Sequence, residues 1–320
     1  MRYFIGIDLG GTNIAAGVVD ENLNILKKGS VPTLASRPAD EIVADMAKLC
    51  LDIVKDAGLS LSDIECAGIA APGTANSETG IIEYANNLPF RNFPIAAKLS
   101  EMSGISRVII ENDANAAALA EAVAGAAKGE RYSVMITLGT GVGGGIIIDG
   151  KVYSGFNHAG AELGHMVISH GGRHCSCGRD GCWEAYSSAT GLINMTKEKI
   201  EECKKSGRET MMTKMIEGSK VSGKTAFAAM KQGDAAAAEV VDEYISYLAC
   251  GISNIINIFQ PSVLSIGGGI CGEGDNLLVP LNKAVWGEVY NSENAERRTE
   301  IRIAQLGNDA GIIGAAALGL

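Results

Sequence analysis

The chain has 320 residues, of which 47% are hydrophobic and 20% charged, so it is long enough for two globular domains and is not a disordered protein. Its net charge of −10 disfavours a nucleic-acid-binding surface, and no apolar run approaches the about 20 residues that cross a bilayer. A strand pattern begins at residue 3, so we expect no signal peptide and a cytoplasmic protein whose eight cysteines are reduced.

The first part of the chain has the pattern of three consecutive strands followed by alternating helices and strands. Strands are expected at residues 3–8, 13–19, 24–32, 64–70 and 108–111, and helices at 39–57, 94–103 and 113–127. This order predicts a mixed sheet with helices packed on it.

The pattern then restarts. Strands are expected at 133–137 and 145–149, near 152–153 and at 263–266, with a mostly helical region at 190–259, including an amphipathic stretch at 234–259, and a last helix at 310–319. Because both halves begin with a strand, a Gly/Thr turn and a second strand, we expect a duplicated α/β architecture with a cleft between two domains.

The domain boundary is predicted near residue 120. Residues 1–120 form the expected small α/β domain, completed by a C-terminal helix at about residues 306–320. Residues 121–305 form the expected large α/β domain, which carries the second turn, a cysteine-rich loop and a helical region for dimer formation.

Two glycine-rich turns stand between paired strands, Asp8-Leu-Gly10-Gly11-Thr12 and Leu138-Gly139-Thr140-Gly141-Val-Gly143-Gly144. Glycines let backbone N–H groups converge on an anion, and the threonine hydroxyls add donors. Asp8 is a candidate for holding Mg²⁺ through water. Each turn alone is equally well explained as a tight β-hairpin, but two such turns opening two similar halves favour phosphate binding.

Two segments match the spacing of the dinucleotide-binding fingerprint, Gly139 to Gly144 and Gly267 to Gly272. A strand follows the first match, which excludes it. The second lies between a strand and a possible helix, so a nicotinamide or flavin site stays open as an alternative.

Three cysteines fall within eight residues, with a histidine ten residues upstream of the first. Three thiolates and one imidazole make the closed ligand set of structural zinc, here His165, Cys175, Cys177 and Cys182. His158, His170 and His174 are alternative ligands, although His174 adjoins Cys175 and is awkwardly placed for the same ion.

Three acidic residues are candidates for chemistry. Glu162 and Glu184 flank the cysteine-rich loop, and carboxylates accept hydrogen bonds from the vicinal hydroxyls of a sugar. Asp113 follows Asn112 at the junction of a strand and a helix. It is either the N-cap of that helix or a general base for phosphoryl transfer.

Together these residues resemble the ROK family of repressors, open reading frames and kinases, over the whole chain. The resemblance rests on Asp8-x-Gly-Gly-Thr12, Ala71-Pro-Gly73, Asn87-Leu-Pro89, Glu111-Asn-Asp113, Leu138-Gly-Thr-Gly141, Glu162-x-Gly-His165, Cys175-x-Cys-Gly-x-x-Gly-Cys182-x-Glu184 and Gly267-Gly-Gly269. It implies an α/β fold of the actin/hexokinase-like (ribonuclease H-like) type, duplicated, with two α/β domains around a cleft.

The resemblance also implies ATP-dependent phosphorylation of a hexose, with Asp113 as catalytic base. The implied sugar-binding residues are Gly73, Asn112, Asp113, Glu162, His165 and Glu184. The implied residues for ATP and Mg²⁺ are Asp8, Gly10, Gly11, Thr12, Gly139, Thr140, Gly141 and Gly143, with Gly267, Gly268 and Gly269 beneath the adenosine. The implied zinc ligands are His165, Cys175, Cys177 and Cys182.

The form of the zinc loop resembles that of glucokinases and amino-sugar kinases, and glucose is the expected substrate. Kinases for N-acetylmannosamine or N-acetylglucosamine, polyphosphate as donor, and a non-catalytic sugar-responsive regulator are the alternatives. Repressors of the family carry an additional helix-turn-helix domain, which we do not expect ahead of a strand at residue 3. The resemblance implies a homodimer or homotetramer, with no nucleic-acid or membrane partner.

Overall fold

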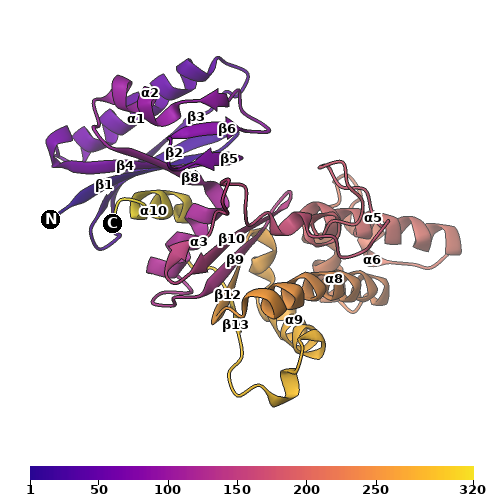
Figure 1. Cartoon of the computed structure of the whole chain (residues 1–320). Coiled ribbons are helices and arrows are strands. Elements are labelled where there is room, and N and C mark those ends of the chain that lie inside the picture. Colours follow the sequence, from indigo (N-terminus) through magenta and orange to yellow (C-terminus); the bar gives the residue numbers. More distant parts are fainter. The chain divides into compact units, whose positions relative to one another are not determined.

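The computed structural model describes residues 1–320, which divide into two compact units (Figure 1). Unit 1 comprises Met1–Met135, Gly145–Ala161 and Ala304–Leu320, and unit 2 comprises Ile136–Gly144 and Glu162–Ile303. Two strands, β9 and β10, contribute residues to both units.

Unit 1 contains a five-stranded mixed sheet. Its strands are β1 (Tyr3–Leu9), β2 (Asn13–Asp20), β3 (Ile25–Pro32), β4 (Ile64–Ala71) and β8 (Val108–Asn112), in the order β3-β2-β1-β4-β8. The first three strands pair antiparallel, whereas β1, β4 and β8 pair parallel. The mixed sheet predicted from the order of elements is therefore confirmed, and the carboxyl ends of β1, β4 and β8 share one edge.

Helices cover both faces of this sheet, which explains the nearly continuous hydrophobic run of β1. The helices are α1 (Ala39–Asp56), α2 (Ile95–Ser103), α3 (Asp113–Ala124) and α10 (Ala310–Ala317). Ile5 and Ile7 join the core that includes Met46 of α1. Phe4, on the opposite face, packs with Ile312 of α10.

Helix α10 approaches the sheet so closely that side chains are excluded from the contact. A Cβ atom on Gly6 of β1 would overlap the carbonyl of Ile312, and one on Gly68 of β4 would overlap that of Ala315. Gly314 lies in the same way against the Ala116 carbonyl of α3. The glycines of β1, β4 and α10 thus allow the helix to lie directly on the strands and on α3.

A second, three-stranded sheet in unit 1 was not predicted from the sequence. It consists of β5 (Thr74–Asn76), β6 (Ile81–Tyr84) and β7 (Arg91–Phe93), in antiparallel order β5-β6-β7. Strands of three or four residues are too short to show a two-residue hydrophobic period.

The third sheet has the order β11-β10-β9-β12-β13. Its strands are β9 (Ser133–Leu138), β10 (Val142–Ile148), β11 (Lys151–Val152), β12 (Val263–Gly267) and β13 (Glu300–Ile303). The prediction that β10 begins at residue 145 is wrong by three residues, because Gly143 and Gly144 carry no side chain that could show the strand pattern. β13 lies in a charged segment and was not predicted.

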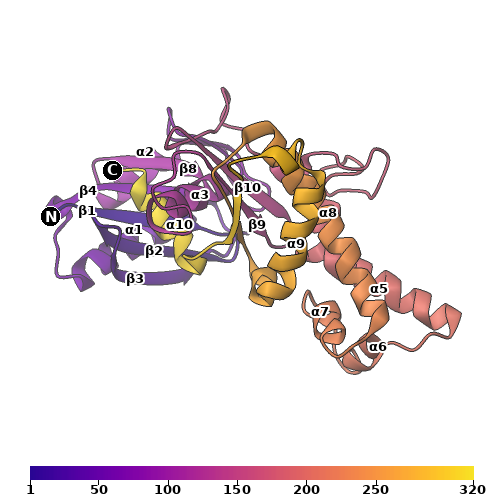
Figure 2. The same cartoon turned by 90° about the horizontal axis from the view of Figure 1, so that it is seen from below.

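Six helices belong to unit 2: α4 (Glu184–Ser187), α5 (Ala189–Ser206), α6 (Met211–Met215), α7 (Thr225–Met230), α8 (Ala235–Phe259) and α9 (Asp275–Glu288). The long helix predicted at 234–259 is confirmed as α8, and Asp234 caps it by accepting hydrogen bonds from the backbone N–H groups of Ala236 and Ala237. α8 and α9 pack side by side (Figure 2). None of the helices is both long and apolar enough to cross a membrane.

Candidate active site

The shared edge of β1, β4 and β8 brings four predicted site residues of unit 1 together. Asp8 stands near the end of β1 opposite Ala70, Gly73 follows β4, and Asn112 ends β8 before Asp113. The Asn112 side chain donates a hydrogen bond from Nδ2 to the Gly73 carbonyl at 3.1 Å. The topology alone therefore gathers residues that are more than 100 positions apart.

Asn112, not Asp113, is the N-cap of α3. Its Oδ1 accepts hydrogen bonds from the backbone N–H groups of Ala114 and Asn115 at 2.9 and 3.2 Å. Asp113 occupies the first helical position, where its carboxylate is exposed and accepts a hydrogen bond from Ala114 N at 2.8 Å. The alternative interpretation of Asp113 as the helix cap is thus wrong, because its neighbour has that role.

Asp8 is a partly buried carboxyl group near a second acidic residue, Asp113. Burial, together with the negative charge of Asp113, raises the pKa of Asp8 from 3.8 to about 6. Gly311 at the start of α10 makes room for this side chain, since a Cβ there would lie 2.5 Å from Asp8 Cγ. Two neighbouring carboxylates repel each other, and a hard divalent cation such as Mg²⁺ would relieve that repulsion.

The first glycine turn joins β1 to β2. Gly10 N donates to the Asn13 carbonyl at 3.0 Å, and the Thr33 hydroxyl donates to the Gly10 carbonyl at 2.6 Å. Gly11, Thr12 and Asn13 are exposed. The segment is a hairpin turn, and it also presents its backbone to solvent directly beyond Asp8.

The second glycine turn joins β9 to β10 in the same way, with a hydrogen bond from Gly139 N to the Gly141 carbonyl at 3.0 Å. The exclusion of a dinucleotide fingerprint at Gly139 is confirmed, because strand β10 follows it. The Thr190 hydroxyl donates to the Thr140 carbonyl at 2.8 Å. Helix α5 therefore supports this turn from behind.

The segment Gly267-Gly268-Gly269 follows β12 and lies against the end of β9. Gly268 has φ of 105°, and a Cβ on it would overlap the Leu138 carbonyl, so only glycine suits this position. A 3-10 helix, Gly269–Glu273, precedes α9. The structure therefore brings two of the predicted ATP-binding segments together in unit 2.

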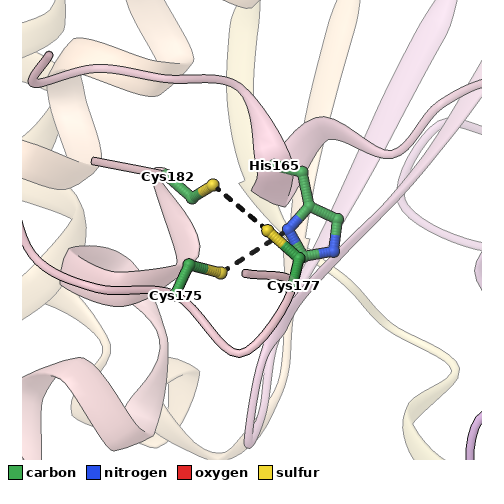
Figure 3. Close-up of side chains that lie close together, drawn as sticks. All are labelled: His165, Cys175, Cys177 and Cys182. Carbon is green, nitrogen blue, oxygen red and sulfur yellow. Dashed lines mark hydrogen bonds between the residues drawn. The ribbon is translucent and has the colours of Figure 1, made fainter. Parts of the chain in front are cut away.

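The four predicted zinc ligands converge on one point (Figure 3). Their ligand atoms all lie within 4.8 Å of one another; Cys175 Sγ is 3.7 Å from His165 Nδ1, and Cys177 Sγ is 3.6 Å from Cys182 Sγ. Corners of a tetrahedron with metal–sulfur bonds of about 2.3 Å are about 3.8 Å apart. The residues therefore fit a tetrahedral zinc ion, with Nδ1 as the coordinating nitrogen of His165.

The alternative histidine ligands are not part of this cluster. His174 Nδ1 lies 2.9 Å from Asp180 Oδ1, and His158 Nδ1 lies 3.5 Å from the Ser77 hydroxyl in unit 1. His170 is exposed and is not among the clustered residues.

The cysteine-rich loop is anchored beneath the candidate metal centre. Trp183, directly after Cys182, is fully buried, and its indole N–H donates to the Tyr247 carbonyl at 2.9 Å. A Cβ on Gly251 of α8 would overlap this indole, so the ring lies directly on the helix backbone. Left-handed backbone at Gly178 and Gly181 turns the loop between its cysteines.

Glu184 connects this loop to the second glycine turn. Its Oε2 accepts a hydrogen bond from Val142 N at 3.0 Å, and its Oε1 lies 3.6 Å from Cys175 Sγ. Glu162 is exposed just before the 3-10 helix Leu163–His165. Of the sugar-binding residues predicted in unit 2, His165 is itself a candidate metal ligand and Glu184 lies beside another, Cys175.

Sequence reasoning missed Gly311 and Glu111. Gly311 contacts Asp8 from the far end of the chain, so no local pattern could reveal it. Glu111 accepts a hydrogen bond from Asn112 N at 2.9 Å, and burial raises its pKa. A glutamate in an otherwise apolar strand was the available signal.

The whole chain is similar to known proteins of one family. Residues 4–320 match the profile of the ROK family. Glucokinases of Halalkalibacterium halodurans and Thermotoga maritima are 37% and 36% identical, with 98% of this chain and 93% and 96% of those proteins aligned. The crystal structure of a ROK family glucokinase from Streptomyces griseus in complex with glucose and AMPPNP superposes with a TM-score of 0.79 at 34% identity, covering 99% of this chain and 98% of that one.

Proposed function

Because the chain belongs to the ROK family, we propose that it transfers the γ-phosphoryl group of ATP to the 6-hydroxyl of glucose. Its similarity to glucokinases extends over nearly the whole length of both proteins. The related structure with glucose and the nucleotide AMPPNP supports both substrates. The protein is accordingly a hexose kinase of the actin/hexokinase-like fold.

Asp113 is the general base of this reaction. The observation that carries this assignment is the exposed carboxylate at the end of β8, beside a neighbour that takes the cap position. The carboxylate accepts the proton of the attacking hydroxyl as the new O–P bond forms and the bond between the γ-phosphoryl group and the leaving ADP breaks. Asn112, whose Nδ2 holds the Gly73 carbonyl, fixes the adjoining backbone and binds the sugar with Gly73.

The two glycine turns bind the phosphates of ATP. The proposed donors are the backbone N–H groups of Gly11 and Thr12 in the first turn, of Thr140 and Gly141 in the second, and of Gly143 near the start of β10. The N–H groups of Gly10 and Gly139 instead close the two hairpins. Mg²⁺, held by Asp8 through water, would neutralise the charge that develops on the transferred group. The glycines 267–269 lie beneath the adenosine.

Glu162, His165 and Glu184 bind sugar hydroxyls. Glu184 has one oxygen on Val142 N, and each carboxylate oxygen can accept more than one hydrogen bond. His165 faces the thiols through Nδ1, which leaves Nε2 as the nitrogen for the sugar. Zinc at His165, Cys175, Cys177 and Cys182 would serve as a structural cross-link that keeps this histidine in place.

We further propose a cytoplasmic homodimer or homotetramer. Three of the eight cysteines are candidate zinc ligands and the other five are unpaired, a usage that suits a reducing compartment. Ile258 of α8 and Val279 of α9 expose apolar side chains, at 66% and 65% exposure, which suits a two-fold contact through unit 2. Light scattering at micromolar concentration tests this, and a monomer would contradict it.

A coupled assay across a hexose panel tests the function. Glucose, mannose, fructose, N-acetylglucosamine and N-acetylmannosamine are each compared by kcat/KM, with ATP and with polyphosphate as donor. We expect the highest value for glucose with ATP, because a site whose polar groups pair with the hydroxyls of one sugar rejects analogues that leave those groups unpaired. Preference for an acetamido sugar would reassign the substrate, and no turnover on any sugar would favour a non-catalytic regulator.

A further inference from the structure

A buried polar pair lies directly behind Asp113. Glu111 of β8 is 6% exposed and Asn115 of α3 is 2% exposed. Glu111 Oε1 accepts two hydrogen bonds, from Asn112 N at 2.9 Å and from Asn115 Nδ2 at 3.0 Å. The pair therefore joins the last strand residues to the first turn of the helix that carries Asp113.

The other polar atom of the Asn115 side-chain amide, its oxygen, lacks a hydrogen-bond partner. Asn115 Oδ1 is buried and has no donor in the protein. Buried amide oxygens are nearly always hydrogen-bonded, because leaving one unpaired costs its full desolvation. An ionised Glu111 carboxylate cannot hydrogen-bond to this oxygen, because it can only accept hydrogen bonds. A protonated carboxyl group, in contrast, donates one O–H. A carboxylic acid that already accepts a hydrogen bond from an amide NH₂ can donate its O–H to the oxygen of the same amide. The two hydrogen bonds then form a cyclic acid–amide pair.

The surroundings favour the neutral acid. β4 presents Ala70 and Ala71 opposite Glu111 and Asn112, and neither β5 nor α10 carries an ionisable side chain. Helix α2, which also packs on β8, carries Lys98 and Glu101, and the Lys98 ammonium pairs with the Asp40 carboxylate of α1 at 2.9 Å. His158 is the titratable group from another element whose charge lowers the pKa of Glu111. Burial acts in the opposite direction and is the larger effect, so the pKa of Glu111 is raised.

We propose that Glu111 is a neutral carboxylic acid whose O–H donates to Asn115 Oδ1, and that this acid–amide ring positions Asp113 for catalysis. The second half rests on the proposed kinase function. The ring holds the Asn112 N–H and the first turn of α3, and Asn112 in turn caps that helix. A neutral ring also adds no third negative charge beside Asp8 and Asp113. Glu111 is thus a positioning residue that acts through its neighbours.

Glu111→Gln is the decisive variant, because glutamine copies the neutral acid. Its amide oxygen accepts from Asn112 N and Asn115 Nδ2, and its NH₂ donates to Asn115 Oδ1. We expect kcat and KM within about twofold of wild type for Glu111→Gln. Glu111→Ala, which removes the ring, is expected to lower kcat about 10- to 100-fold with little change in the KM for glucose. Glu41→Gln, at an exposed position of α1, is the matched control.

The pH profile separates positioning from a purely structural role. Wild-type kcat is expected to fall at alkaline pH as the ring loses its proton, whereas Glu111→Gln keeps its kcat there. If Glu111→Gln loses as much activity as Glu111→Ala, or if Glu111→Ala keeps wild-type kcat, the positioning role is overturned.

Infrared difference spectra test the protonation without any turnover. At pH 7 the wild type minus Glu111→Gln spectrum should show the C=O stretch of a protonated carboxylic acid, and the wild type minus Glu41→Gln spectrum should show only a carboxylate band. Absence of the acid band would overturn the neutral ring. A protein that phosphorylates no sugar yet keeps this band would refute the proposed function and leave the ring intact.

Discussion

The carboxylate of Glu184 accepts a hydrogen bond from the backbone N–H of Val142 at 3.0 Å. Glu184 follows the last cysteine of the candidate metal centre by two residues, and Val142 begins β10 directly after the second glycine turn. A single side chain therefore links the loop that would hold zinc to the turn that would hold phosphate. A substitution that displaces the cysteine-rich loop should therefore also displace the second glycine turn, and the reverse.

Cys177→Ser should lose the metal and weaken ATP binding as well as sugar binding. Serine is a poor zinc ligand, and the loss of one of the four clustered side chains leaves the ligand set incomplete. Metal analysis of the purified protein is expected to give one zinc per chain in the wild type and much less in the variant, with a raised KM for ATP and glucose.

Cys250→Ser is the control, because Cys250 lies on α8 outside the cluster and should leave the zinc content unchanged. A metal-free variant that binds ATP and glucose normally would show that the loop does not shape either site.

Gly141→Ala should destabilise the second turn, whereas Gly139→Ala should not. A Cβ on Gly141 would overlap the Glu184 carboxylate, and one on Gly139 would meet no atom within 4 Å. Breaking a packed, hydrogen-bonded contact of this kind costs about 1–3 kcal/mol. Thermal unfolding without ligands measures both variants; equal Tm values for the two would contradict the contact.

The candidate site was predictable where it depends on local sequence or on topology. The spacing of Cys175, Cys177 and Cys182 placed three of the clustered side chains in one short loop. The order of strands and helices also predicted a mixed sheet with helices packed on it, which the structure confirms. These features need no knowledge of how distant elements pack.

The contacts that tune the site were not predictable. Gly311 contacts Asp8, and Glu184 hydrogen-bonds to Val142. Both contacts depend on the packing of elements that are far apart in the sequence, which local sequence patterns do not determine. The sheet β5-β6-β7 was not predicted for a different reason, because its strands are too short to show a two-residue hydrophobic period. Likewise, which of two adjacent polar residues, Asn112 or Asp113, would cap α3 depends on backbone geometry at one position.

Asp113→Asn should abolish phosphoryl transfer while glucose binding is retained. The amide has nearly the same shape but cannot take up the proton, and a general base contributes about 10²–10⁴-fold to the rate. Coupled kinase assays give kcat, and calorimetric titration gives the glucose affinity. Asp52→Asn, an exposed surface substitution, is the control. Turnover of Asp113→Asn near the wild-type level would refute its role as base.

Asp8→Asn should make the protein more stable at neutral pH while it loses kinase activity. The folded pKa of Asp8 is raised from 3.8 to about 6, so the folded state binds a proton that the unfolded state releases between these values. Stability from this group is therefore fully present below pH 3.8 and is lost as the pH rises to about 6. Above that pH the ionised, partly buried carboxylate costs about 3 kcal/mol, at 1.36 kcal/mol per pH unit.

Asparagine cannot ionise, so the variant avoids this cost. We expect its Tm to exceed that of the wild type by several degrees at pH 7.5 without nucleotide or Mg²⁺, and the difference to vanish near pH 4. Metal loss at low pH affects both proteins alike, so the difference between them isolates Asp8. A variant less stable than the wild type at pH 7.5, or a difference independent of pH, would contradict the raised pKa. Asp8 thus lowers the stability of the ligand-free protein at neutral pH. Such a cost is typical of a residue whose role is to bind a ligand, here a cation together with the phosphates that it coordinates.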